Sequence, residues 1–250
     1  FAGLCWKVIR INGDGSIRMI YDGDATRETT SIGISKFNIN DNDNAYVGFK
    51  FERSRLHGIA LNSTVLTKLD TWYNDNLKNY ADKIDLNAGF CNDREPSTSN
   101  TTSNGMGGLG TRSTYYGAYN RFRVGEDWKT TQAPTFKCKN SSDLFTTAVA
   151  TKGNKSLTNP IGLITADEVI FGGGFGGVNN STYYLYTSQN YWTMSPFSAG
   201  GNAHIFIVGS DGQLTPNLVP ATASIRPVIN LRADTKFSGT GLESDPFVVV

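Results

Sequence analysis

Tight-turn signals between short apolar runs place the strongest constraint on how this chain can fold. "CWKVIRI" (5–11) has β-branched and aromatic residues at alternate positions, "NGDG" (12–15) follows it, and "SIRMIYDG" (16–23) resumes the pattern. Asn-Gly and Asp-Gly tolerate the positive φ that tight hairpin turns require. Near the C-terminus "GSDGQ" separates 203–208 from 213–219 in the same way. The sequence therefore predicts antiparallel hairpins at both ends of the chain.

Helical signals are few. Only residues 62–84 show a long run of apolar residues three and four positions apart, with Ser63 as the predicted N-cap. Thr165 and Glu168 have capping-box spacing, which predicts a short helix that the glycines at 172–174 end. Further strands are predicted at 45–51, 181–187, 191–196, 224–231 and 245–250, whereas 113–122 fits a strand or a packed loop.

These elements predict one loop-rich α+β domain over 1–250, with an antiparallel sheet and about two main helices. Residues 92–112 are rich in Ser, Thr, Asn and Gly, so we expect a long surface loop or insertion there. The chain begins at Phe1 in mid-pattern and without Met, so we expect a fragment or a processed product.

Charge excludes several classes of partner. The 23 basic residues nearly balance the 22 acidic ones, which gives a net charge of +1, and the basic residues form no stripe along the sequence. We therefore expect no nucleic-acid partner and no anionic membrane surface. The sequence contains no window of 18 apolar residues that could span a membrane, so we expect no membrane insertion by this segment.

The three cysteines form no CxxC pair, which argues against a zinc ribbon or a redox motif. Cys91 and Cys138 both lie in polar loop sequence and would be natural disulfide partners in an exported protein. Cys5 lies in an apolar strand pattern and is expected to be a buried free thiol.

The catalytic inventory is sparse. His57 and His204 are the two histidines, and there is no GxSxG motif to favour a catalytic triad. Asp143, Asp167 and Glu168 are interpreted as helix caps and solvated faces. The glycines at 172–174 follow a helix instead of preceding one, so they do not fit a phosphate loop. We expect neither an enzyme nor a cofactor.

Three acidic residues are candidate calcium ligands, and one arginine lies in an apolar strand pattern. Asp211, Glu243 and Asp245 could supply oxygen ligands, but a turn and a strand lead-in explain them more simply, so no metal is expected. Arg226 lies between Ile and Pro in an apolar strand pattern, so we expect a buried or half-buried salt bridge with a structural role.

Several motifs occur in the same order as in a large family of exported proteins from Gram-positive bacteria, and the chain resembles that family over nearly its whole length. The motifs are "CWKVIRINGDGSIRMIYDG", "FCNDR", "TYYGAYNR", "NPIGLITADEV", "YLYTSQNYWTMSPFS" and "IRPVINLRAD…SGTGLESDPFVV". The C-terminal third is similar to the C-type-lectin-like fold shared by formylglycine-generating enzymes and by variable proteins of diversity-generating retroelements. Two histidines cannot supply a three-histidine iron site, and the cysteine contexts do not match a formylglycine-generating site.

The resemblance implies a division between scaffold and display. Trp192, in "YWTMSP", and Met194 would pack inward, Pro196 would close the strand, and 197–223 would be a displayed hairpin face. Strand alternation places one set of residues on that face. A shift of one residue in the register would turn the same side chains into the core, so both arrangements remain open. The expected ligand-binding set is Ser198, Asn202, His204, Phe206, Thr215, Asn217 and Leu218.

Two functions remain open. The first is a non-catalytic, adhesin-like display protein, exported or at the cell surface, that binds a protein or glycan partner through a variable C-terminal face, with or without diversification by a retroelement. The second is a structural cell-envelope or pilin-like subunit whose same face makes assembly contacts.

Overall fold

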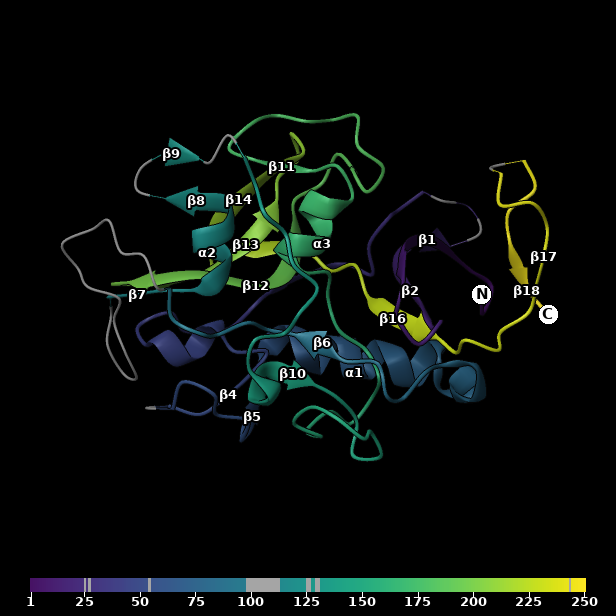
Figure 1. Cartoon of the computed structure of the whole chain (residues 1–250), viewed down its shortest axis with the longest axis horizontal. Helices are drawn as coiled ribbons and strands as arrows, with labels where there is room; N and C mark the ends of the chain where they lie inside the picture. Colours follow the sequence, from purple (N-terminus) through teal and green to yellow (C-terminus); the bar gives the residue numbers. More distant parts are fainter. Residues whose placement is uncertain are drawn as a thin grey trace.

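Strands from both ends of the sequence meet in one small sheet of this α+β protein (Figure 1). The computed structural model describes residues 1–24, 26, 28–53, 55–97, 113–124, 127–128, 131–242 and 244–250. In it β1 (Leu4–Ile11) and β2 (Ile17–Asp24) form the predicted hairpin, and β16 (Val228–Leu231) pairs with the other side of β2. The turn is closed by a 2.8 Å bond from Asn12 N to Ser16 O, and Gly15 has a φ of 87°. Because β1 pairs only with β2 in this sheet, it is an edge strand.

The larger sheet has seven strands in the order β11-β14-β13-β12-β15-β3, and β7 pairs with the end of β12. The predicted C-terminal hairpin forms, with a 2.8 Å bond from Gly209 N to Gln213 O in its turn. The strands are β3 (Ile34–Lys36), β7 (Ser113–Tyr115), β11 (Phe175–Gly176), β12 (Tyr191–Gly200), β13 (Ala203–Val208), β14 (Gln213–Leu218) and β15 (Thr222–Ser224).

Helices are short apart from α1 (Thr64–Asn76), which runs along the lower side in Figure 1. Ser63 caps α1 as predicted, and the helical pattern continues only as the 3-10 helix η2 (Lys78–Lys83). α3 (Ala166–Phe171) has the predicted capping box, and α2 (Gly117–Phe122) follows β7. No helix among the described residues is long and apolar enough to cross a bilayer.

Small elements complete the described chain. They are η1 (Asn44–Val47), η3 (Ser141–Asp143), β4 (Lys50–Phe51), β5 (Leu61–Asn62), β6 (Phe90–Cys91), β8 (Arg123–Val124), β9 (Asp127–Trp128), β10 (Leu144–Phe145), β17 (Phe237–Ser238) and β18 (Val248–Val249).

Two predicted strands are wrong for local reasons. Over 45–51, Asp43 accepts a 2.9 Å bond from Ala45 N and starts the 3-10 helix η1, so only Lys50 and Phe51 are in a strand. Residues 181–187 form no strand either. Their alternation comes from a loop that buries every second side chain, because Tyr183 and Leu185 enter the core.

The predicted end of the strand at 191–196 and the predicted start of the loop at 92–112 are both wrong. β12 continues past Pro196 to Gly200, because shifts in register on both sides of Pro196 accommodate the missing N–H. The predicted surface loop at 92–112 is wrong at its start, where Asn92 and Arg94 are fully buried. Residues 98–112 lie outside the described part of the chain.

The expected structural residues occupy the core. Trp192 is fully buried, and its Nε1 donates a 2.8 Å bond to Ser35 O. Arg226 is 1 % exposed and donates a 2.8 Å bond to Asp22 Oδ1, as the sequence predicted for a cation in an apolar strand. Its guanidinium also bonds to the Leu185 carbonyl at 2.9 Å, so it joins three separate segments.

Candidate functional site

The ligand-binding set predicted for the hairpin face is only partly on the surface. Asn202 and Leu218 are exposed, and His204, Thr215 and Asn217 are partly exposed. Ser198 is only 5 % exposed and Phe206 is fully buried, so the expected common exposure of the seven residues is wrong.

The reason is that β13 is an inner strand covered on the face that was expected to be solvated. β12 and β14 flank it, and Phe206 packs against Phe197 with ring centroids 5.1 Å apart and against Phe122 of α2 at 6.2 Å. Burial also lowers the pKa of His204, an effect only partly offset by its bond to Asn202 O. Alternation correctly groups the residues of a strand by face, but it does not say whether a helix covers that face.

A five-residue segment, Cys91–Glu95, organises the polar interior instead. Cys91 forms the predicted disulfide with Cys138, with the Cα atoms 5.6 Å apart. The Asn92 side chain accepts from Phe49 N at 2.8 Å and donates to Met194 O at 2.7 Å, which ties the segment to the residue before β4 and to β12. Cys5 is a free thiol as expected, although it is only partly buried.

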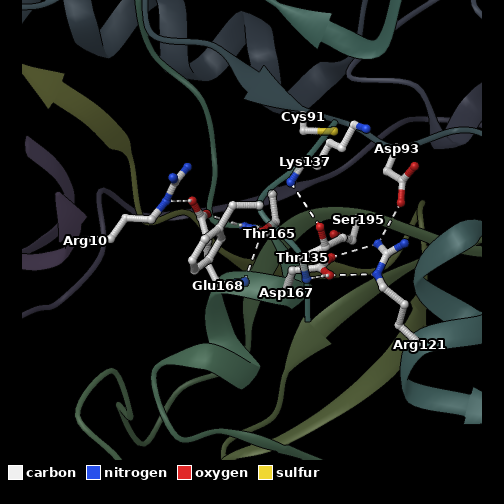
Figure 2. A pocket seen from close by; sticks show the side chains of 11 residues that line it. Arg10, Cys91, Asp93, Arg121, Thr135, Lys137, Thr165, Asp167, Glu168 and Ser195 are labelled. Atoms are coloured by element: carbon white, nitrogen blue, oxygen red, sulfur yellow. Dashed lines mark hydrogen bonds and ion pairs between the residues drawn. The ribbon is translucent and has the colours of Figure 1, made fainter. Parts of the chain in front are cut away.

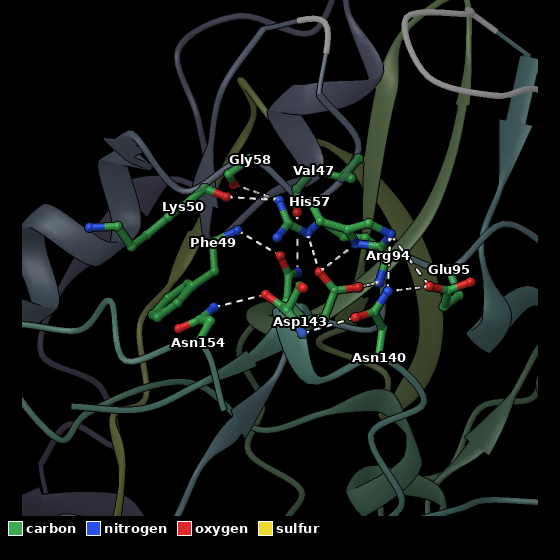
Figure 3. A network of polar contacts seen from close by, with 12 residues as sticks. Val47, Phe49, Lys50, His57, Gly58, Arg94, Glu95, Asn140, Asp143 and Asn154 are labelled. Carbon is green, nitrogen blue, oxygen red and sulfur yellow. Dashed lines mark hydrogen bonds and ion pairs between the residues drawn. The ribbon is translucent and has the colours of Figure 1, made fainter. Parts of the chain in front are cut away.

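Arg94 and Asp143 form a buried ion pair on one side of this segment (Figure 3). Arg94 Nε lies 2.7 Å from Asp143 Oδ1, and Arg94 N donates to Asp143 Oδ2 at 2.7 Å. Arg94 Nη1 donates to the carbonyls of Lys50 and Gly58, each at 3.0 Å. The pair therefore fixes three chain segments around one carboxylate.

His57 extends this network toward solvent (Figure 3). Its Nδ1 lies 3.0 Å from Asp143 Oδ1, and its Nε2 lies 3.3 Å from the amide nitrogen of Asn140. The same amide donates to Glu95 Oε1 at 2.7 Å. With a proton on Nδ1, the imidazole donates to Asp143 and accepts from the Asn140 amide.

His57 borders an open cleft of about 270 Å³. We call it the His57 cleft, and its lining residues are His57, Ile59, Ser141, Ser142, Gly153 and Asn154. Asn154 is fixed by a 2.8 Å bond from its amide to Ser142 O. The cleft thus combines neutral hydrogen-bonding groups with one exposed apolar side chain, that of Ile59.

A second charged cluster lies on the other side of Cys91–Glu95 (Figure 2). Arg121 bridges Asp93 at 2.6 Å and Asp167 at 2.7 Å. Asp167 also accepts from Thr135 N at 2.9 Å. The cavity there is about 30 Å³, enough for a water or two but not for a sugar ring.

Glu168 takes part in the same cluster, where it pairs with the fully buried Arg18 and with Arg10 at 3.1 Å. The sequence interpretation of Asp143, Asp167 and Glu168 as solvated carboxylates is therefore wrong. Glu168 does act in the capping box, but all three side chains are at most 5 % exposed and all three pair with arginine. Nothing in the sequence pairs these residues with arginines so far away along the chain.

Two of the three buried carboxylates, Asp143 and Glu168, predict a loss of stability in acid. Burial raises the pKa of Asp143, but the hydrogen bond from His57 and the charge of Arg94 outweigh it and leave the pKa below its usual value of 3.8. Burial acts likewise on Glu168, and the charges of Arg18 and Arg10 bring its pKa below the usual 4.5. Carboxylates with lowered pKa stabilise the fold above their unfolded values, and that contribution is lost as the pH falls through the folded values.

We therefore expect the melting temperature to fall steeply as the pH drops below about 4.5. Asp143→Asn should melt lower than the parent at neutral pH and show a shallower decline in acid, because one of the two groups no longer titrates. The measurement is a series of thermal melts across the acid range. Parallel pH profiles for the parent and the variant would contradict the assignment to Asp143.

The disulfide gives a second stability prediction. It closes a loop with a sequence separation of 47 and joins the Cys91–Glu95 segment to the loop whose Thr135, Phe136 and Lys137 line the cavity of the charged cluster. Removing both cysteines as Cys91→Ser/Cys138→Ser should lower the free energy of unfolding by about 2–4 kcal/mol. Denaturant titration measures the change, and Cys5→Ser is the matched control. A double variant as stable as Cys5→Ser would show that the bridge does not constrain the fold.

Metal ligands do not gather in the described part of the chain, where no group of three His, Cys, Asp or Glu side chains could hold an ion. Asp211 lies in the turn between β13 and β14 as expected, and its Oδ1 accepts from Gln213 N at 3.0 Å. Asp245 accepts from Thr240 N at 2.9 Å, and Glu243 lies outside the described residues.

Comparison with known proteins places the chain in no family: no protein-family model, no curated protein and no solved structure matches it. The two polar centres on either side of Cys91–Glu95 are the candidates for a functional site. Of these, only the His57 cleft is wide enough to receive part of a ligand.

Proposed function

We propose that this chain is an exported, non-catalytic binding protein that holds a neutral sugar unit of a glycan in the His57 cleft. The observation that carries the proposal is the fixed polar wall of an open cleft of about 270 Å³. Binding sites combine a few well-placed polar groups with apolar contact area, and this cleft offers the Ser141 and Ser142 hydroxyls and the partly exposed His57 ring beside Ile59.

The buried ion pair behind the wall supports a binding role. A buried Arg–Asp pair is a costly way to stabilise a fold, because desolvation offsets much of its Coulombic attraction. Here the pair holds His57 by a 3.0 Å bond at a place where the imidazole is 26 % exposed. Such preorganisation lowers the entropy that a ligand loses when its hydroxyl groups find partners.

Binding is favoured over catalysis by the direction of the imidazole. An Asp–His pair could act as a general base if a nucleophile met the second ring nitrogen. Instead His57 Nε2 faces the Asn140 amide at 3.3 Å and the Glu95 carboxylate at 3.4 Å. The Asn140 amide, which can donate a hydrogen bond to Nε2, occupies the position that a nucleophilic hydroxyl would need.

The experiment is a glycan array followed by calorimetric titration of the best glycan. Ser141→Arg should fill the cleft and remove binding, and because Ser141 is exposed the substitution should leave the melting temperature unchanged. Ser238→Arg, at an exposed position of β17, is the matched control and should bind like the parent. Equal binding by Ser141→Arg and the parent, or no glycan retained by the parent, would refute the proposal.

We also propose a specific fold within the α+β class. A C-type-lectin-like arrangement is supported by the order of three features: the Trp192 strand, the β13–β14 hairpin and the strand that follows Arg226. If a retroelement diversifies 197–223, we expect the changes at exposed positions such as Asn202 and Leu218, and not at Phe206.

A second candidate function is a structural subunit of the cell envelope. The β17–β18 hairpin carries four exposed apolar side chains, those of Leu242, Phe247, Val248 and Val250. Two-stranded hairpins are marginally stable in water, so assembly contacts could cover this one. Light scattering should then show concentration-dependent oligomers that Phe247→Ser abolishes; a parent that stays monomeric would exclude this function.

A further inference from the structure

A row of exposed aromatic and apolar side chains runs beside the edge strand β1 and has no role in the proposed function. Phe171 is 63 % exposed, Tyr184 56 %, Val8 42 % and Phe136 41 %. Together with Lys7 and Arg10 we call these residues the β1 strip. Exposed apolar side chains need no explanation singly, but a contiguous group on a folded protein marks a contact surface.

Side-chain contacts form two groups in the β1 strip, and β1 itself joins them. The Phe136 and Phe171 ring centroids are 4.6 Å apart, and the Arg10 guanidinium carbon lies 4.5 Å from the Phe136 centroid. At the other end Lys7 Nζ lies 5.6 Å from the Tyr184 ring centroid. The Tyr184 hydroxyl is also hydrogen-bonded to the backbone of Val8, which connects the two ends through β1.

The charges of the β1 strip are arranged with cations outward and carboxylates inward. Lys7 and Arg10 are 26 % and 22 % exposed, whereas their partners Asp22 and Glu168 are 15 % and 2 % exposed. Lys137 follows Phe136 directly, is exposed, and has no ion-pair partner among the described residues. A ligand therefore meets positive charge, although Asp14 lies in the turn beyond the end of β1.

β1 also offers backbone hydrogen bonds. Its eight residues pair only with β2 among the strands of the described chain, so its outer edge has no strand partner (Figure 1). The Tyr184 hydroxyl, which bonds to the Val8 backbone, is the group that an added strand would displace. Unpaired N–H and C=O groups on an edge accept an added strand, and an extended peptide is the ligand that supplies the matching groups. A glycan cannot provide this regular pattern of donors and acceptors.

We propose that the β1 strip binds an extended, acidic polypeptide segment that adds a strand to the edge of β1. Carboxylates of the segment meet Lys7, Arg10 and Lys137, and its apolar side chains cover Val8, Tyr184 and Phe136. The binding surface is separate from the His57 cleft and does not rest on the glycan proposal.

The test uses short fluorescein-labelled peptides and fluorescence anisotropy. The probe alternates Glu with Val; one comparison peptide alternates Lys with Val, and another is the Glu–Val peptide with alternate backbone nitrogens methylated. We expect the parent to bind the Glu–Val peptide at least about tenfold more tightly than either comparison peptide. Added salt should weaken the binding, because the charged contacts are at the surface.

Variants assign the binding to the β1 strip. Lys7→Glu and the double variant Phe171→Ala/Tyr184→Ala should each weaken binding by about tenfold, the loss expected for contact residues of this kind. Val149→Ala, an exposed apolar residue elsewhere (69 % exposed), should bind like the parent. Ser141→Arg should also leave peptide binding unchanged, which separates this surface from the cleft. Melting temperatures confirm that each variant is folded.

Several outcomes would overturn the proposal. Equal affinity for the Glu and Lys peptides would exclude charge recognition, and equal affinity for the methylated peptide would exclude strand addition. Full binding by folded strip variants would place the peptide elsewhere. Self-association of the parent that the strip variants abolish would make a second copy the occupant. Binding of polygalacturonate without binding of the peptide would identify an acidic glycan surface instead.

Discussion

Trp192→Ala should lower the free energy of unfolding by about 3–5 kcal/mol, the usual range when a large aromatic side chain is removed from a core. Trp192 is fully buried in β12, and its ring packs edge-on against Phe37 with centroids 5.7 Å apart. The substitution also removes the indole donor to Ser35 O, which is 2.8 Å away and belongs to β3. The loss therefore combines a cavity with a buried carbonyl left without its partner.

Trp192→Phe separates the two contributions. Phe keeps most of the apolar volume but has no donor for Ser35 O, so its loss should be smaller than that of Ala and close to the cost of one buried hydrogen bond, about 1–3 kcal/mol. Urea titration measures both variants against the parent. Unfolding midpoints for Trp192→Ala within error of the parent would mean that β12 does not organise the core.

Local sequence signals identified the elements that local interactions determine. Asn-Gly and Asp-Gly turns located both hairpins, and Ser63 and Thr165 located the starts of α1 and α3. These predictions succeed because turn and cap geometry is decided within a few residues. The α+β class follows from the same signals, while pairing of β2 with the distant β16 depends on the whole chain.

The candidate site was missed because long-range pairing creates it. His57, Glu95 and Asp143 are far apart in the sequence, and no local pattern relates them. The polar run at 92–95 is typical of a surface loop, yet Arg94 is buried because Asp143 neutralises it. One available signal was the Cys91–Cys138 disulfide, which brings the segments before and after it together.

Face assignment failed for a related reason. The alternation of β13 correctly places His204 and Phe206 on the same side. The sequence pattern does not show that α2 and Phe197 cover that side, because covering elements come from other parts of the chain. Exposed positions of a hairpin become predictable only when its place in the sheet is known.

Asp143→Asn should cost about 3–5 kcal/mol of unfolding free energy, as expected when one partner of a buried ion pair is removed. Arg94 is fully buried, and the change leaves its guanidinium without a counter-charge. The cost should be smaller in the double variant Arg94→Met/Asp143→Asn, because no unpaired charge then remains in the interior. Chemical denaturation of the parent, the two single variants and the double variant gives the coupling between the sites.

The exposed pair Arg232–Asp234, with side chains 54 % and 71 % exposed, supplies the control for that cycle. Asp234→Asn removes the same charge at the surface, where water screens it, and should not change the stability measurably. A large loss for Asp143→Asn beside no loss for Asp234→Asn attributes the effect to burial. If Asp143→Asn lowered the free energy of unfolding no more than Asp234→Asn, the buried network would not stabilise the fold. The His57 side of the cleft would then lack the rigid support on which the binding proposal depends.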